Sequence, residues 1–179
     1  MKNINITTWL RTMAACAVIG LFALLAAGCG SGREGGMPAT ETIASAVAPT
    51  TLNAVLSGAQ EVPPVVSAGS GTATVTIDAA RTTITVTLNT TGLTGVTASH
   101  IHAGAVGING GVIFPLFAAP AAFPATLTKT LTSADFTPDA ANAVNTFADA
   151  VNAMLIGNTY INVHTVAHLG GEIRGQLTP

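Results

Sequence analysis

Threonine alternates strictly with apolar residues in two neighbouring stretches of the chain, and this pattern limits both stretches to β-structure. Residues 72–78 have the sequence TATVTID and residues 83–89 the sequence TITVTLN. Successive side chains of a strand point to opposite faces, so each stretch predicts a strand with one apolar and one polar face. The intervening Asp-Ala-Ala-Arg of residues 78–81 predicts a turn, and the whole segment predicts a hairpin. Its core face is expected to contain Val75, Ile77, Ile84, Val86 and Leu88.

Further short strands are expected throughout the chain after residue 50, and many of them are separated by glycines. They are predicted near residues 51–57, 96–102, 111–117, 124–131, 158–165 and 171–177. Many short strands with turn residues between them predict an all-β fold, an antiparallel β-sandwich or barrel of about eight strands.

One segment departs from the β pattern and predicts a helix from about residue 138 to 156. Thr137-Pro138-Asp139 has an N-cap residue, a proline for the first turn and an acidic side chain near the positive end of the helix dipole. Apolar residues then recur at spacings of three and four, as in an amphipathic helix. The helix is expected to pack across the sheet.

The amino-terminal residues are typical of an export signal. Lys2 and Arg11 precede an apolar run over residues 13–27. The run ends in Leu-Ala-Ala-Gly-Cys at residues 25–29, which is similar to a bacterial lipobox, although alanine stands three residues before the cysteine where leucine is usual. In a lipoprotein Cys29 would become the acylated first residue of the mature chain. An ordinary cleavable signal is the alternative.

This interpretation divides the chain into three parts. We expect a lipoprotein-type signal peptide over residues 1–28, a flexible tether over residues 29–50, and a β-domain over residues 51–179. The tether is assigned from its Gly, Ser, Ala, Thr and Pro content and its lack of periodicity. The protein is accordingly expected in the cell envelope, as an outer-membrane lipoprotein or in the periplasm, with lipid on Cys29 holding it to the membrane.

The charge of the chain argues against one class of function, and its cysteine content argues against a disulfide in the domain. Without Lys2 and Arg11, the chain has four basic and eight acidic side chains, a net charge of about −4 with neutral histidines. It lacks a basic patch, so nucleic-acid binding is disfavoured. Cys16 would leave with the signal and Cys29 would be acylated, so no disulfide is expected in the domain.

All four histidines of the chain fall in two short segments: His100, His102, His164 and His168. His100 and His102 share one face of their strand, and His164 shares a face of its own strand with Tyr160 and Asn162. One interpretation is a metal site, because imidazole nitrogens are ligands that Cu(II) and Zn(II) favour. The other is a hydrogen-bonding network that fixes the glycine-rich loops.

The remaining polar motifs give little support for catalysis. Glu172 and Arg174 share a strand face and are expected to form a structural pair or a solvated surface. The sequence has no Gly-x-Ser-x-Gly motif, and its glycine-rich segment 104–111 lacks the lysine of a phosphate-binding loop. A binding protein is therefore favoured over an enzyme.

Four ordered motifs carry a resemblance to a known family: LSGAQEVPPV at 56–65, HIHAG at 100–104, NVHT at 162–165 and GGEIRGQL at 170–177. Together they resemble the CHRD domain, which is named for its occurrence in chordin and is also common in bacterial exported proteins. The resemblance covers about residues 51–178. It implies an all-β, immunoglobulin-like domain and supplies no active site.

Three functions follow in order of preference. The first is an exported, lipid-anchored, non-catalytic binding module with an envelope protein or a glycan as its partner. The second is a copper- or zinc-binding protein that uses the histidine cluster, and the first two can coexist. The third is a metal redox enzyme similar to copper/zinc superoxide dismutase, suggested by a His-x-His strand in a sandwich fold but lacking that enzyme's further histidines and disulfide.

Overall fold

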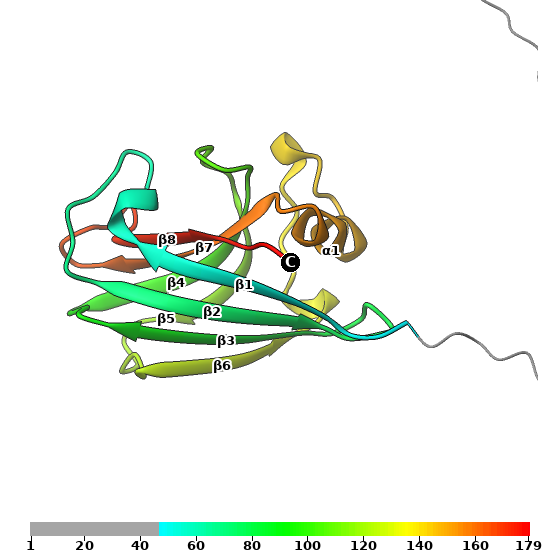
Figure 1. The fold of residues 1–179 in the computed structure, drawn as a ribbon, viewed down its shortest axis with the longest axis horizontal. Helices are drawn as coiled ribbons and strands as arrows, with labels where there is room; N and C mark the ends of the chain where they lie inside the picture. The colour runs from blue at the N-terminus through cyan, green and yellow to red at the C-terminus, as the bar shows by residue number, and fades with distance from the viewer. Residues whose placement is uncertain (1–46) are drawn as a thin grey trace, which may run out of the picture. The chain divides into compact units, whose positions relative to one another are not determined.

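The computed structural model describes residues 47–179, which form eight antiparallel strands in one continuous sheet with one short α-helix (Figure 1). The strands are β1 (Thr50–Ser57), β2 (Ser70–Ile77), β3 (Ile84–Thr91), β4 (Val96–Ala103), β5 (Val112–Ala118), β6 (Thr126–Leu131), β7 (Thr159–Thr165) and β8 (Ile173–Gln176). Their order in the sheet is β5-β4-β7-β8-β1-β2-β3-β6. The predicted all-β class with about eight strands is confirmed.

The threonine-rich segment forms the predicted hairpin, β2 and β3. Its five predicted core residues are each at most 1% exposed. They join a single apolar cluster with residues from β1, β4, β7 and β8, among them Leu52, Ile101 and Ile161. In the turn, Asp78 Oδ1 accepts hydrogen bonds from the backbone N–H groups of Thr82 and Thr83, the two residues before β3, at 2.7 and 2.8 Å.

The sheet curls until its two edge strands approach each other, so it is nearly closed. β5 and β6 stand at opposite ends of the strand order and share no backbone ladder. The Lys129 ammonium of β6 donates a 2.7 Å hydrogen bond to the Pro115 carbonyl of β5. A side chain therefore spans the seam where a barrel would have a backbone ladder.

The helix is shorter than the sequence pattern predicts. The helix α1 (Phe147–Leu155) begins after Thr146, whose side chain and that of Asp149 form a reciprocal capping box. The preceding residues form a tight loop instead, in which Asp139 pairs with Val144 and Ala143 has a left-handed φ of 57°. The predicted N-cap at Thr137 is wrong because residues 139–144 fold into this loop, and the helix begins only after Thr146.

Three short 3-10 turns complete the described chain, at Gly58–Gln60, Ser133–Asp135 and Ala140–Asn142. No helix within residues 47–179 has the length and apolar character needed to cross a membrane. The predicted signal peptide, Cys29 and most of the predicted tether lie outside the described residues.

Candidate metal centre

Strands β4 and β7 bring the two histidine segments together. In their antiparallel register, His100 lies opposite Asn162 and His102 lies opposite Tyr160. His164 lies opposite Ala98, diagonally across from His100, and diagonal neighbours on one face are within reach of long or aromatic side chains. The pairing of β4 with β5 shifts register beside both β4 histidines. Such irregularities re-aim side chains, and they are frequent next to functional sites.

Three of the four histidines converge. One ring nitrogen from each of His100, His102 and His164 lies within 4.8 Å of the other two. The closest pair is His100 Nδ1 and His164 Nε2, at 3.1 Å. His168 is outside this group, in the turn between β7 and β8, where its backbone N–H donates to Thr165 Oγ1.

Backbone carbonyls fix the orientation of two of the rings. His102 Nδ1 lies 2.9 Å from the Gly110 carbonyl oxygen, and His164 Nδ1 lies 2.9 Å from that of Leu169. A carbonyl oxygen only accepts, so both Nδ1 atoms carry a proton and both Nε2 atoms are unprotonated. This is the outer-shell arrangement that orients metal-ligating histidines in proteins.

The closest pair of nitrogens has the spacing of two ligands on a small divalent ion. A tetrahedral ion about 2.0 Å from two nitrogens holds them about 3.3 Å apart, close to the 3.1 Å that separates His100 from His164. His102 Nε2 is buried and has no hydrogen-bond partner among residues 47–179, and because Nδ1 carries the proton, Nε2 has a lone pair to offer. To bind the ion through Nδ1 as a neutral imidazole, His100 would carry on Nε2 the proton that its Nδ1 donates to His164 Nε2 in the metal-free protein. Three neutral imidazoles form a donor set suited to Cu(II) or Zn(II).

The surroundings keep the imidazoles neutral. Burial, reinforced by the neighbouring His164 and His102, lowers the pKa of His100 to about 4. Burial also lowers the pKa values of His102 and His164 from their ordinary value. Neutral imidazole is the form that binds metals. His102 is buried, whereas His100 and His164 are half-buried, so solvent reaches one side of the cluster.

A glycine-rich loop over residues 104–111 covers this face of the sheet. The Gly110 N–H donates to Tyr160 Oη at 3.2 Å while its carbonyl accepts from His102. A side chain at Gly110 would collide with the Ala103 carbonyl, so only glycine permits this close approach. Arg174 is 2% exposed beneath the loop, and its guanidinium donates to the Ile108 carbonyl at 2.8 Å and to Asn109 Oδ1 at 2.9 Å.

Glu172 and Arg174 use different partners. Glu172 accepts hydrogen bonds from Ser67 Oγ at 2.7 Å and Thr165 Oγ1 at 2.6 Å. Arg174 instead lies over the ring of Tyr160, with its Cζ 3.4 Å from the ring centroid. The stacking of Tyr160 and Arg174 beside the cluster was not predicted from the sequence, although the alternation of β7 and β8 places both residues on the side opposite the core.

The family model of the CHRD domain matches residues 52–177, which include all four histidines. The chain belongs to the CHRD-domain family. No curated protein and no solved structure matches it. Membership in this family suggests a binding-module role.

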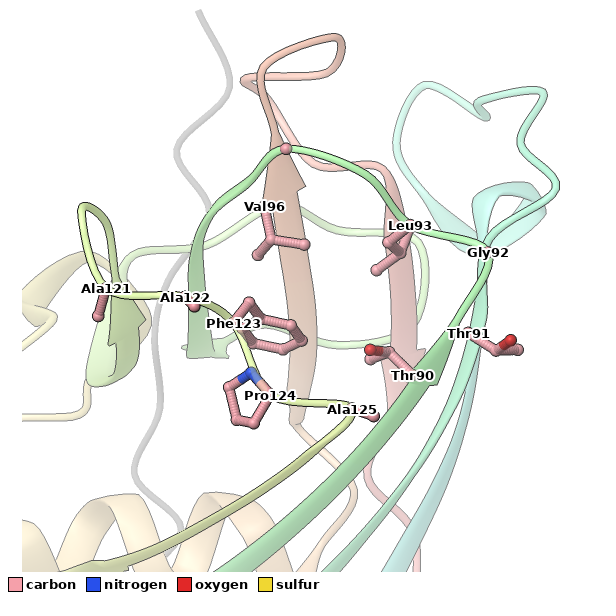
Figure 2. A pocket seen from close by; sticks show the side chains of 11 residues that line it. Thr90, Thr91, Gly92, Leu93, Val96, Ala121, Ala122, Phe123, Pro124 and Ala125 are labelled. Atoms are coloured by element: carbon pink, nitrogen blue, oxygen red, sulfur yellow. The ribbon is translucent and has the colours of Figure 1, made fainter.

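A separate pocket of the CHRD domain lies where the turn after β3 faces the segment that leads into β6 (Figure 2). Its volume is about 460 Å³. Leu93, Val96 and Phe123 contribute its largest apolar side chains, and Thr90 and Thr91 its hydroxyl groups. None of the residues that line it is titratable. The pocket therefore lacks the ligands that the histidine cluster provides, and the cluster is the better candidate for chemistry.

Proposed function

We propose that this protein is an exported, lipid-anchored CHRD-domain binding module whose ligand is a Cu(II) or Zn(II) ion held by His100, His102 and His164. The observation that carries the metal assignment is the convergence of three imidazole nitrogens within 4.8 Å. Two of these rings are held by carbonyls with Nε2 unprotonated. A site with one solvent-accessible side suits an ion that is taken up and released.

Metal content tests this assignment. Full-length protein saturated with Cu(II) or Zn(II) and then dialysed is expected to retain one ion per chain. His102→Ala and His164→Ala should each lose that ion, because each removes one of three nitrogens. His168→Ala is the matched control, since His168 lies outside the cluster, and it should retain the ion. Retention by both cluster variants, or loss in the control, would contradict the assignment.

Export and lipid anchoring are supported by the charged start, the apolar run and the Leu-Ala-Ala-Gly-Cys motif at residues 25–29. A lipid on Cys29 would place the CHRD domain at a membrane surface. The wild-type chain expressed in a bacterium should incorporate labelled fatty acid and sediment with membranes. Cys29→Ser should do neither, and unchanged labelling in that variant would exclude Cys29 as the anchor.

A further inference from the structure

Arg174, Tyr160 and His102 form a continuous three-layer stack beside the histidine cluster. The Arg174 guanidinium carbon lies 3.4 Å from the centroid of the Tyr160 ring. The Tyr160 and His102 rings are parallel to within 7°, with centroids 4.8 Å apart. Strand β7 lies between β4 and β8 in the sheet, so Tyr160 stands between the other two side chains.

The loop over residues 104–111 forms a hydrogen bond with each of the three side chains of this stack. Its carbonyls and Asn109 Oδ1 accept the hydrogen bonds of Arg174, as described above. Gly110 alone holds the other two layers, because its N–H donates to Tyr160 Oη and its carbonyl accepts from His102 Nδ1. The plane of the His102 ring is thus fixed by a stacking surface and by a hydrogen bond in its own plane.

We infer that Tyr160 and Arg174 are positioning residues of the metal centre, which hold the His102 ring so that its Nε2 faces His100 and His164. This inference rests on the proposed function. Within residues 47–179 the His102 Nε2 has no hydrogen-bond partner, so its direction depends on the contacts that hold the rest of the ring. The flat guanidinium of arginine stacks on aromatic faces, whereas the ammonium of lysine does not. Outer-shell partners of this kind typically change metal affinity by about 10- to 100-fold.

A purely structural stack would stabilise the fold without acting through His102, and a double-mutant cycle separates the two roles. Cu(II) affinity is measured by titration for Tyr160→Leu in the wild-type protein and again in His102→Ala, in which the two remaining histidines should hold the ion too weakly to survive dialysis but tightly enough to titrate. We expect a loss of about 10-fold or more in the wild-type background and little further loss when His102 is absent. Tyr160→Phe keeps the ring and should keep most of the affinity. An equal loss in both backgrounds would overturn the inference.

A second readout needs no metal. Imidazole nitrogen NMR of the metal-free full chain should show His102 as a single Nδ1–H tautomer in the wild type and in Tyr160→Phe. In Tyr160→Leu the ring should lose this preference, and an unchanged His102 signal would overturn the positioning role. Arg174→Lys, which keeps the charge but not the flat stacking surface, replaces Tyr160→Leu in both experiments if the leucine variant does not fold.

The two readouts also distinguish this inference from the proposed function. If the wild-type protein binds neither Cu(II) nor Zn(II), the proposed function fails, and with it the role of the stack in a metal centre. If the wild type binds the ion but Tyr160→Leu binds it equally well, the metal site stands and the positioning role is wrong.

Discussion

Glu61 is a carboxyl group that the fold encloses on the outer side of the sheet. The side chain is 6% exposed, and its Oε1 has no hydrogen-bond partner within residues 47–179. Gly171, with a φ of 127°, lies directly against the carboxyl group, where a Cβ would collide with it. Burial raises the pKa of Glu61 from 4.5 to about 7, although the positive charge of Arg174 acts in the opposite direction. The native protein therefore holds this proton more tightly than the unfolded chain does.

This shift predicts a pH-dependent stability. Because the native state binds the proton more tightly, the contribution of Glu61 is most favourable below pH 4.5 and is lost as the pH rises through about 7. Glu61→Gln removes this dependence. The free energy of unfolding of the variant, relative to wild type, should rise by about 1–3 kcal/mol between pH 4.5 and pH 8. Urea denaturation at both pH values measures it, and a difference that does not change with pH would contradict the assigned pKa.

Glu172→Gln is the matched control for that experiment. Burial acts to raise the pKa of Glu172, but hydrogen bonds from Thr165 and Ser67 outweigh burial and lower it below 4.5. Its contribution to stability is therefore present above pH 4.5 and is lost only at lower pH. The difference between Glu172→Gln and wild type should stay constant from pH 5 to pH 8.

At the scale of elements, α1 shows how a local loop can displace a predicted helix start. Thr137 and Thr146 are both threonines followed by an acidic residue within three positions. Of the two, only Thr146 has the capping geometry. The Asp149 N–H donates to Thr146 Oγ1 at 3.1 Å, and the Thr146 N–H donates to Asp149 Oδ2 at 2.9 Å. The backbone N–H of Thr137 instead donates to the Ile113 carbonyl of β5.

Substitution of these two threonines tests the helix boundary. Thr146→Ala removes an N-cap side chain and should lower the free energy of unfolding by about 1 kcal/mol. Thr137→Ala changes an exposed side chain without a hydrogen bond in the described chain and should stay within about 0.5 kcal/mol of wild type. Equal effects in the two variants, measured by chemical denaturation, would contradict the capping assignment.

The strands were predictable where one face meets the core and the other meets water. Val75 and Val86 alternate with threonines, and that pattern alone locates β2 and β3. In β7 the same rule places Ile161 and Val163 inward, as observed, but it cannot show that Tyr160 and Asn162 on the other face are only 3% exposed. Their burial depends on the loop over residues 104–111, which is distant in sequence.

The candidate site was partly predictable for the same reason. Residue spacing places His100 and His102 on one face, but only the pairing of β4 with β7 brings His164 to them. His168 is three residues beyond the end of β7, so strand alternation does not govern where its side chain points. The Arg174–Tyr160–His102 stack combines side chains from three strands, so no local pattern of the sequence predicts it.

At the scale of the whole molecule, the apolar core and the histidine cluster occupy opposite sides of the same strands. Ile101 and Ile161 are fully buried in the core, while their neighbours His100, His102 and Asn162 face the covering loop. One sheet thus supports both the fold and the candidate centre. Substitution of a histidine on the outer face should leave the packing of the core intact. Histidine variants are therefore suitable for binding experiments.

The most direct test of the metal assignment is anomalous diffraction from crystals of the protein loaded with Cu(II) or Zn(II), recorded at the absorption edge of the metal. We expect one strong peak about 2.0–2.1 Å from a nitrogen of each of His100, His102 and His164. A peak elsewhere, for example at His168, or the absence of any peak in fully loaded crystals, would contradict the account. In that case the histidines would serve only to fix the loops.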